Sequence, residues 1–377
     1  MPRRGHNEGN IRKRPDGRWE SRVRLPDGRR KSFYGKTRAE VARKLALAFQ
    51  ALEQGAPMGD ERVTVGEFLD VWLEDGARPT VKPSTLEGYE RALRLHIKPH
   101  LGHMRLRELT PYHVQRWLNI LSDGGMATST IRVQLAILRR ALGQGESWGM
   151  VPRNVARLID GPTIHREERV VLDASDARRL LDQVRGDRYE ALWLIALSTG
   201  ARQGEILGLR WIDIDLDAGL IHIRQALIKR TGAIVFGPPK TAAGARSIPI
   251  TKSSIEMLRS HRERQDSERE NSSDWEDYGL VFPSSRGTPL DHGRVRTMLH
   301  RHLEAAGLKR MRFHDLRHSC ATLLLAQGVD LKTISAILGH ASIAITANLY
   351  AQVLPDLKAD AAQRLEAAFR QSESEGS

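Results

Sequence analysis

The stretch that decides the fold runs from His314 to Tyr350 and reads HDLRHSCATLLLAQGVDLKTISAILGHASIAITANLY. In its first half, apolar residues recur at helical spacing until Gly328, which predicts an amphipathic helix that stops at this glycine. His314 and Arg317 are three residues apart on that helix, so we expect both side chains to project from one face. An imidazole and a guanidinium placed in this way can bind a phosphate group together.

The second half of the stretch adds another imidazole and a phenol. Leu331 to Leu338 is amphipathic and is expected to form a helix that ends at Gly339. His340 follows directly, in a turn that can direct its ring into a cleft. Tyr350 lies ten residues further along the chain. Its hydroxyl is a potential nucleophile beside a phosphate site.

A second arginine precedes this stretch in STGARQGEILGLRW, which begins at Ser198. Thr199 or Ser198 is expected to cap a short helix, and Glu205 completes the first turn of that helix. Arg202 is then placed at a helix N-terminus, where an anion is favourably bound. Arginine stays charged at physiological pH and offers a planar fork of donors that suits the non-bridging oxygens of a phosphodiester.

Together, these residues resemble the tyrosine recombinases, the phage-integrase family of site-specific DNA recombinases. The catalytic set of that family is Arg, Lys, His, Arg, His or Trp, and Tyr, in this order. The matching positions in this sequence are Arg202, Lys240, His314, Arg317, His340 and Tyr350. Glu205 matches an acidic residue that commonly supports the active site. The resemblance extends over roughly residues 160 to 360 and is much less specific before them.

The lysine of the resemblance lies in the segment FGPPKTAAGARSIPI. Residues 235–236 and 247–250 are expected to be strands on either side of a turn, as in the β-hairpin that bears the lysine of the family. Lys240 occupies this turn in the sequence. The alternatives, if the register of the hairpin is different, are Lys229, Arg230 and Lys252.

The resemblance implies a reaction in which Tyr350 attacks the scissile phosphorus in line. The products are a 3′-phosphotyrosyl bond and a free 5′-hydroxyl group, so the energy of the phosphodiester bond is conserved. No cofactor is therefore expected, neither ATP nor a metal ion. Arg202 and Arg317 would carry the transition-state charge that a magnesium ion carries elsewhere.

The family also implies the proton transfers. The hydroxyl of a tyrosine has an ordinary pKa of about 10 and needs a base to accept its proton; His314 is the expected general base. Lys240 is expected to protonate the leaving 5′-oxygen, and His340 to hydrogen-bond a non-bridging oxygen.

Other reactive side chains in the same stretch have structural interpretations. His318 is expected on the packing side of its helix. Cys320, the single cysteine of the chain, is expected to fill the core. No Cys-x-x-Cys or His-Glu-x-x-His pattern is present, so the sequence predicts no zinc site.

Composition favours a polyanionic partner. The chain has 377 residues, a formal net charge of +13 and a pI of about 10.1, and nucleic acid is the commonest partner of such a protein. No apolar run approaches the ~18 residues that a membrane span needs. The start MPRRGHNEGN has no apolar core of a signal peptide. We therefore expect a cytoplasmic protein that binds double-stranded DNA and no membrane.

The N-terminal residues 1–56 hold most of this charge, with 15 Lys and Arg against 6 Asp and Glu. Two turn signals, at 15–17 and 26–28, separate three short segments, and a helix is expected from Thr37 to about Gln54. A three-stranded sheet with one helix is similar to the arm-type DNA-binding domain of some integrases. The alternative is a solvated basic hairpin or a flexible leader. The candidate DNA contacts are Arg12, Arg14, Arg18, Arg22 and Arg24.

Residues 63–160 are predicted to form a small all-α domain, similar to the core-binding (SAM-like) domain of the family. The segment from 159 to 169, which contains Gly161-Pro162, is the expected linker to a catalytic domain at 168–354. The alternative for each basic residue here is a solvated helix face. The candidate phosphate contacts are Thr85, Arg91, Arg94, Lys98, Thr128, Arg132, Arg139 and Arg140.

The predicted fold class is therefore multidomain α+β: a small three-stranded sheet plus helix, an all-α core-binding domain and a mainly α catalytic domain with a small β-sheet or hairpin. Residues 355–377 are predicted to form a tail helix that docks on a neighbouring protomer, giving a homotetramer on DNA; the alternative is docking in cis. An excision factor and a host DNA-bending protein are possible partners. The rival functions are a type IB topoisomerase and a non-catalytic DNA-binding regulator.

Overall fold

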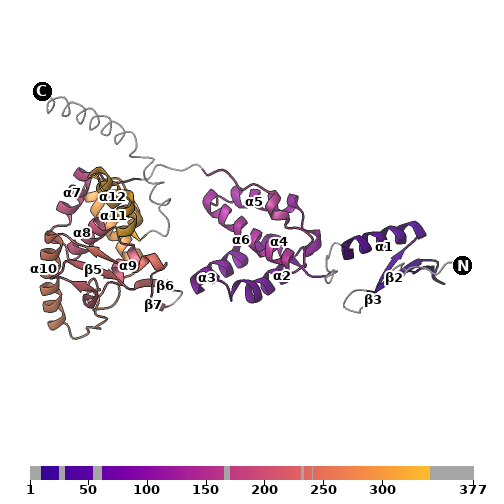
Figure 1. Cartoon of the computed structure of the whole chain (residues 1–377), viewed down its shortest axis with the longest axis horizontal. Helices are drawn as coiled ribbons and strands as arrows, with labels where there is room; N and C mark the ends of the chain where they lie inside the picture. Colours follow the sequence, from indigo (N-terminus) through magenta and orange to yellow (C-terminus); the bar gives the residue numbers. More distant parts are fainter. Residues whose placement is uncertain are drawn as a thin grey trace, which may run out of the picture. The chain divides into compact units, whose positions relative to one another are not determined.

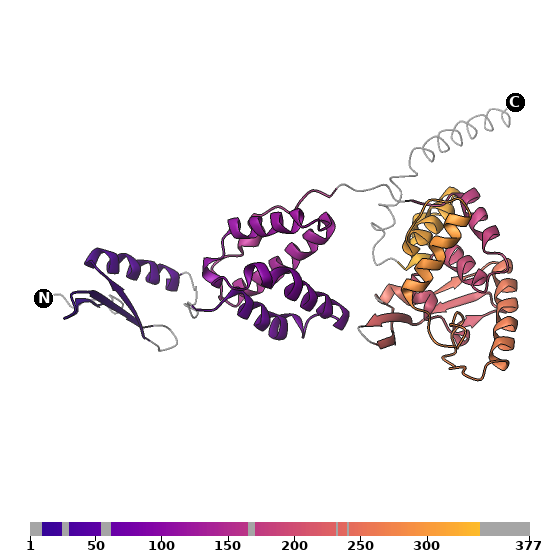
Figure 2. The ribbon, with the colours of Figure 1, turned by 180° about the vertical axis from the view of Figure 1, so that it is seen from behind.

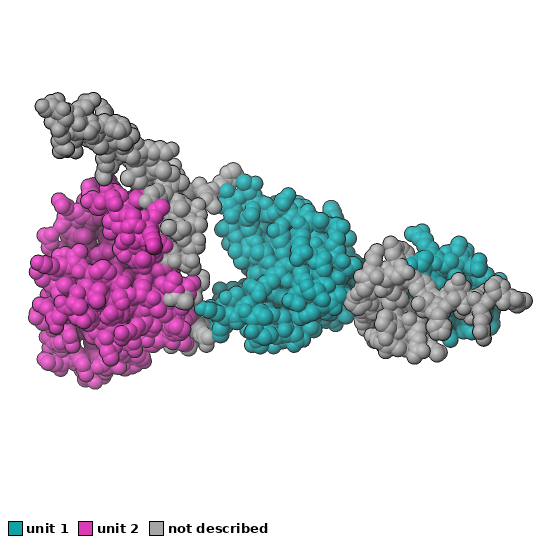
Figure 3. Space-filling model, in the orientation of Figure 1, with its two compact units in different colours: residues 1–166 teal, residues 167–377 magenta. Residues whose placement is uncertain are grey.

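The computed structural model forms two compact units, residues 1–166 and 167–377 (Figure 3). Each unit is described here by itself. The residues that the structure describes are 10–24, 30–53, 62–164, 170–230, 233–239 and 241–339. None of the helices among them is long and apolar enough to cross a membrane.

The first unit begins with the predicted sheet and helix (Figure 1). The strands β1 (Asn10–Lys13), β2 (Trp19–Arg24) and β3 (Arg30–Gly35) are antiparallel in the order β1-β2-β3. Gly17, at a φ of 80°, makes the turn between the first two strands. The helix α1 (Arg38–Glu53) then packs against β2 and β3. The predicted turn at 26–28 lies outside the described residues. The described residues resume at Arg30, the first residue of β3.

The rest of the first unit is helical, as predicted. Its helices are drawn in violet to magenta in Figure 2, and the first two each run on without a break into π-helical turns. α2 (Val65–Val71) is followed by η1 (Trp72–Ala77), and α3 (Pro83–Ala92) by η2 (Leu93–Ile97) and α4 (Lys98–Leu101). A π-turn inserts one residue per turn and so rotates the helix faces that follow it.

Two longer helices complete this part of the chain. They are α5 (Pro111–Asp123) and α6 (Thr128–Ser147), and the short 3-10 turns η3 (Leu106–Glu108) and η4 (Val155–Leu158) lie before and after them. Helix α5 starts where Thr110 accepts a hydrogen bond from the backbone of the first turn. The helices bury one apolar core, whose largest members are Phe68, Trp72, Leu93, Trp117 and Leu138.

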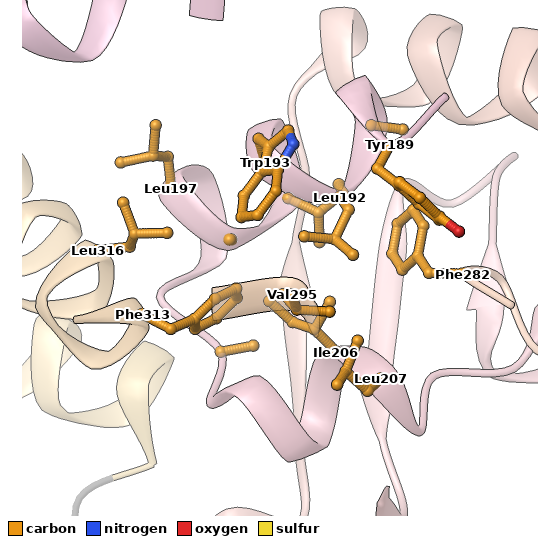
Figure 4. Packing of buried hydrophobic residues seen from close by; sticks show 14 of the residues in the cluster. Tyr189, Leu192, Trp193, Leu197, Ile206, Leu207, Phe282, Val295, Phe313 and Leu316 are labelled. Atoms are coloured by element: carbon orange, nitrogen blue, oxygen red, sulfur yellow. The ribbon is translucent and has the colours of Figure 1, made fainter. Parts of the chain in front are cut away.

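The second unit is built around α8 (Glu190–Thr199), a mostly apolar helix that buries seven of its ten residues. Figure 4 shows Trp193 of this helix among Phe313 and other apolar side chains of the core. Helices α10 (Lys252–Glu270) and α12 (Phe313–Ala326) both pack against α8.

The other helices in the described part of the second unit surround this centre. They are α7 (Ala174–Gln183), α9 (Gln203–Leu207), α11 (His292–Ala305) and α13 (Leu331–Leu338). Helix α13 packs on α12, and the two meet around a small apolar cluster that contains Cys320 and Leu338.

Two small antiparallel sheets lie in the same unit. The strand β5 (Leu220–Ile223) pairs with both β4 (Ile214–Asp215) and β8 (Arg246–Pro249), and β6 (Ala226–Arg230) pairs with β7 (Ala233–Gly237). The predicted fold class, mainly helical with small sheets, is confirmed.

The pairing of the predicted hairpin around Lys240 was wrong. The strands β7 and β8 both form, but they belong to different sheets and do not pair with each other. Pro238 and Pro239 follow β7 directly and lack the N–H groups that would continue a ladder. The chain therefore leaves the β6-β7 hairpin before it joins β5 through β8.

Candidate active site

Helix α12 carries the two residues of the His-x-x-Arg pattern. Its N-cap is Arg312, whose backbone N–H donates to the Asp315 carboxylate at 2.9 Å, so that the helix begins at Phe313. His314 lies in the first turn and remains exposed, whereas Arg317, one turn later, is only 1% exposed. The predicted helix is confirmed, and it carries both residues.

The second arginine is held by a buried carboxylate. Arg202 is the N-cap of α9, and its backbone N–H and its Nη1 donate to the two oxygens of Glu205, at 3.0 and 2.7 Å. Glu205 is 2% exposed. Burial opposes its charged form, but the charges and hydrogen bonds of Arg246 and Arg202 outweigh burial and lower the pKa of this carboxyl.

The predicted cap of this helix was wrong. Thr199 is the last residue of α8, where its hydroxyl donates to the carbonyl of Ile195 and accepts from the N–H of Ala201. Gly200 then turns the chain at a φ of 58°, and Arg202 itself takes the cap position of α9. Threonine can bond back to a carbonyl of its own helix, and here that local bond replaces the capping role.

Arg246, at the start of β8, is a site residue that sequence reasoning missed. Its side chain is 7% exposed, and Nη2 donates to Glu205 Oε2 at 3.0 Å. Nε donates to the carbonyl of Ile337 at 2.6 Å, and Nη1 to the carbonyl of Gly244 at 2.9 Å. The only sequence feature that could have indicated Arg246 is its position at the start of a predicted strand. Arginines are too common at such positions for this feature to identify a site residue.

Arg317 is buried without a full set of partners. Its Nη1 donates to the carbonyl of Gly200 at 2.9 Å, while Nε and Nη2 have no partner among the described residues. Burial, followed by the positive charges of Arg202 and Arg246, lowers the pKa of Arg317 to about 9. It remains protonated at neutral pH, and among the described residues that act on it the positive charges of Arg202 and Arg246 are opposed by the carboxylate of Glu205. This imbalance favours a bound anion.

His314 is electrically coupled to the same arginines. Desolvation of the ring, followed by the positive charge of Arg317, lowers its pKa, with a smaller contribution from Arg202. The ring of His318 meets it edge to face at a centroid distance of 4.8 Å. His318 is buried, as predicted. His314 is therefore neutral at pH 7 and able to accept a proton.

The remaining predicted site residues have different outcomes. Cys320 is buried in the apolar cluster, as expected, and burial raises the pKa of its thiol to about 12. Lys240, His340 and Tyr350 lie outside the described residues. Gly339, which precedes His340 in the sequence, ends α13 at a φ of 65° as predicted. Within the described ranges, no three His, Cys, Asp or Glu side chains are grouped to hold a metal ion.

The basic face of the N-terminal sheet is built on a buried acid. Glu20 on β2 is 1% exposed, and both Arg12 and Arg22 donate to its carboxylate, at 2.8 and 2.9 Å. Hydrogen bonds and charges of the two arginines, with that of Arg12 the largest, lower the pKa of Glu20. The carboxylate of Glu20 therefore offsets part of the positive charge of this sheet face and orients the guanidinium groups of Arg12 and Arg22.

The other candidates on this sheet differ in their surroundings. The guanidinium of Arg14 lies 5.4 Å from the centre of the Tyr34 ring. Arg18 is exposed in the turn before β2. Arg24 ends β2, and its side chain is outside the described part of the structure.

The candidates of the helical region separate into exposed and structural residues. Arg91 and Arg94 are exposed and form no ion pair with another described residue, as a phosphate contact requires. Arg139 is half-buried, and its Nε donates to the carbonyl of Ala156 at 3.0 Å and its Nη2 to that of Ile159, so it is a weaker candidate for such a contact.

The other basic and hydroxyl candidates of this region have these positions. Lys98 forms an ion pair with Asp70, Arg132 donates to the carbonyl of Pro162 at 3.1 Å, and Arg140 donates to the hydroxyl of Tyr89 at 3.0 Å. Thr85 is exposed in α3, and Thr128 is half-buried at the start of α6. A residue with an internal partner must give it up to bind DNA, so Lys98, Arg132 and Arg140 are weaker candidates than Arg91 and Arg94.

Comparison with known proteins agrees with this geometry. Residues 170–356 match the model of the phage integrase family, and residues 64–122 match the model of the phage integrase N-terminal SAM-like domain. A tyrosine recombinase XerC-like protein of Caldanaerobacter subterraneus subsp. tengcongensis is 32% identical over 90% of this chain and 92% of that protein. An integrase of Streptomyces ambofaciens is 30% identical over 88% of this chain and 89% of that protein.

Solved structures share the fold. The Tn1549 transposon integrase, in complex with a circular intermediate DNA, has a TM-score of 0.67 and 22% identity, covering 76% of this chain and 95% of that one. The lambda integrase tetramer bound to a Holliday junction has a TM-score of 0.57 and 20% identity, covering 92% and 96%.

The chain belongs to the tyrosine recombinase family, the phage integrases, and is an enzyme that cleaves and rejoins DNA strands. Its relatives include integrases of prophages and other mobile elements, which supports the function of site-specific recombinase of a mobile element.

Proposed function

We propose that this recombinase integrates a mobile element through a covalent 3′-phosphotyrosyl intermediate, with Tyr350 as the nucleophile. The observation that supports this most directly is Arg317, a buried guanidinium with two N–H-bearing nitrogens that lack partners among the described residues. A phosphodiester would supply the missing acceptors. The adjacent pair of Arg202 and Glu205 places a second guanidinium fork at the same site.

In the proposed reaction, a bond forms between the Tyr350 oxygen and the scissile phosphorus while the bond to the 5′-oxygen breaks. His314 accepts the tyrosine proton, and its lowered pKa supports this role because the imidazole is neutral at pH 7. Lys240 protonates the leaving 5′-oxygen. Arg202, Arg317 and His340 bind the non-bridging oxygens.

In this proposal, four segments of the chain have different functions. Residues 1–56 bind arm-type DNA sites, 63–160 bind the core site, 168–354 form the catalytic domain, and 355–377 contact a neighbouring protomer in a DNA-bound homotetramer. Linking two DNA-binding modules raises the effective concentration of one site once the other is bound. The protein would act on double-stranded DNA in the cytoplasm, with an excision factor and a host DNA-bending protein as further partners.

The rival function is that of a type IB topoisomerase, which shares the chemistry but relaxes DNA without specific sites. The basic sheet of β1, β2 and β3 favours recombination, because Arg12 and Arg22 are held by Glu20 on what we propose is a second surface for DNA. A non-catalytic regulator would not need a buried, partly unpaired Arg317.

The test is to isolate DNA that stays covalently attached to the protein in cells that carry the native element. Lysis in SDS would be followed by sequencing of the attached ends, for the wild type and for Tyr350→Phe. We expect ends at one or two loci that the substitution abolishes. Scattered ends that still need Tyr350 would indicate a topoisomerase, and the absence of attached DNA in the wild type would contradict the enzymatic proposal.

A further inference from the structure

Arg246 joins three segments of the second unit that are distant in sequence. Its Nη2 reaches Glu205 in α9, its Nε reaches the carbonyl of Ile337 in the last turn of α13, and its Nη1 reaches Gly244, two residues before it. The last carbonyls of a helix have no partner within the helix. Arg246 supplies one for α13.

These contacts close into a ring with Arg202. The Nη2 of Arg202 donates to the carbonyl of Gly339, at the end of the same helix, at 3.3 Å. Arg202 and Arg246 therefore both bind the C-terminal end of α13, and the carboxylate of Glu205 lies between their guanidinium groups at 2.7 and 3.0 Å. Movement of one member of this ring would change the position of the others.

Arg246 does not itself have the properties of a phosphate ligand. Each of its three guanidinium nitrogens already donates to a protein acceptor, and the side chain is 7% exposed. Arg317 is the contrasting case, since two of its nitrogens have no partner among the described residues. Arg246 is therefore suited to orienting other groups.

We propose that Arg246 is a positioning residue of the recombination site. It fixes the Glu205 carboxylate that orients Arg202, and it fixes the turn at Gly339 that leads into His340. Without it, Glu205 can rotate toward Arg202 alone and the end of α13 loses an anchor. The inference rests on the proposed function, because it assigns Arg246 a role in that same reaction.

The test compares Arg246→Met and Arg246→Lys with the wild type. Methionine has a similar length without the charge, and lysine keeps the charge but cannot bridge three acceptors. The matched control is Arg185→Met, which removes an exposed arginine paired with Asp182 in the same unit. For each full-length protein, thermal stability, binding to attachment-site DNA and the rate of covalent complex formation would be measured.

Two DNA substrates distinguish a role of Arg246 in positioning Arg202 from a general loss of protein stability. One has an ordinary scissile phosphodiester, and the other has a methylphosphonate that lacks one negative oxygen. If Arg246 acts by orienting Arg202, removing Arg246 should slow the reaction less on the methylphosphonate, because this substrate has less negative charge for Arg202 to stabilise. We expect Arg246→Met to slow the phosphodiester reaction about 10–100-fold, a range typical of residues that orient a functional ligand, and to slow the methylphosphonate reaction markedly less.

The remaining outcomes are also informative. Arg246→Lys should fall between methionine and the wild type, and it can carry the substrate comparison if the methionine variant does not fold. Equal slowing on both substrates, or no slowing, would overturn the positioning role while leaving the proposed function intact. A wild-type protein that forms no covalent complex on either substrate would overturn the proposed function, and the inference with it.

Discussion

Arg317 illustrates how burial defines a reactive site at the scale of single residues. A guanidinium that is 1% exposed and lacks partners for Nε and Nη2 among the described residues is unfavourable in the unbound protein. A bound phosphodiester would restore these hydrogen bonds. The nearby charges of Arg202 and Arg246 make the unbound site still less favourable, as the lowered pKa of Arg317 shows. The unbound site is therefore preorganised for an anion.

The pKa of His314 predicts how the rate of covalent complex formation depends on pH. Because the pKa is lowered, the ring stays neutral until the pH falls below the ordinary histidine value of about 6.5. We therefore expect the second-order rate constant, which reports the groups of the unbound enzyme, to be insensitive to pH near 7. It should decline only in acid below that value. Stopped reactions on attachment-site DNA between pH 5 and 8 measure this.

The control for this prediction is His314→Gln, in which the acidic decline should disappear together with most of the activity. A decline in the wild type that begins at or above pH 6.5 would be incompatible with a lowered pKa of His314.

At the scale of elements, the two glycines that end α12 and α13 have unequal surroundings. Gly328 and Gly339 both have a positive φ, of 79° and 65°. A Cβ added at Gly328 would meet no atom within 4 Å, whereas one at Gly339 would lie 2.6 Å from the carbonyl oxygen of Ala243 and 2.9 Å from Arg246 Cδ. The end of α13 is therefore packed tightly against the network of Arg246.

We predict that Gly339→Ala is the more damaging of the two alanine substitutions. Gly328→Ala adds only the strain of the left-handed backbone, about 1–2 kcal/mol, whereas Gly339→Ala must also displace Ala243 or Arg246. Thermal melting and the rate of covalent complex formation would be compared for both variants. Equal losses of activity in the two proteins would show that the packing around Gly339 does not matter for the reaction.

The helices of the first unit offer a second matched pair, Arg94 and Arg139. Arg94 is exposed in η2, while Arg139 in α6 is bonded to the carbonyls of Ala156 and Ile159. Arg94→Ala should weaken DNA binding and reduce the slope of log affinity against log salt by about 1. Arg139→Ala should instead lower the thermal stability. Filter binding over a range of salt, combined with melting curves, distinguishes the two, and the opposite pattern would refute the assignment.

At the scale of the whole molecule, positive charge is distributed over separate parts of the chain. Residues 1–56 hold a net +9 of the total +13, and the second unit has its own cluster of guanidinium groups around Glu205. A protein with two such surfaces can bind two classes of DNA site at once. This division suits an enzyme that must assemble several DNA segments before it cuts them.

The tail provides the prediction that belongs to this scale. Deleting residues 355–377 should impair the pairing of two DNA sites much more than the binding of one site, because the tail is proposed to contact a neighbouring protomer. Gel-shift assays can resolve the single-site complex from the synaptic complex. If the deletion weakens both complexes to the same degree, the tail is not a contact between protomers.

The sequence by itself was sufficient to predict several local elements and to propose which residues are catalytic. Helical spacing of apolar residues and a glycine at each C-terminus were sufficient to predict α12 and α13, and turn signals were sufficient for β1 to β3. These features depend on residues within a few positions of one another. The order of the six matching residues depends on the sequence alone.

Only the tertiary structure decided how distant segments meet. The pairing of β8 with β5 joins residues 23 to 29 positions apart, and Arg246 contacts Glu205 and Ile337, which lie 41 and 91 positions away from it. The local sequence carries no information about such contacts. The residues around an arginine at the start of a strand can be the same whether its side chain faces water or a buried carboxylate. Burying a charged group is unfavourable unless it gains a partner of opposite charge and hydrogen bonds. Which charged groups are buried, and beside which partners, depends on the tertiary structure.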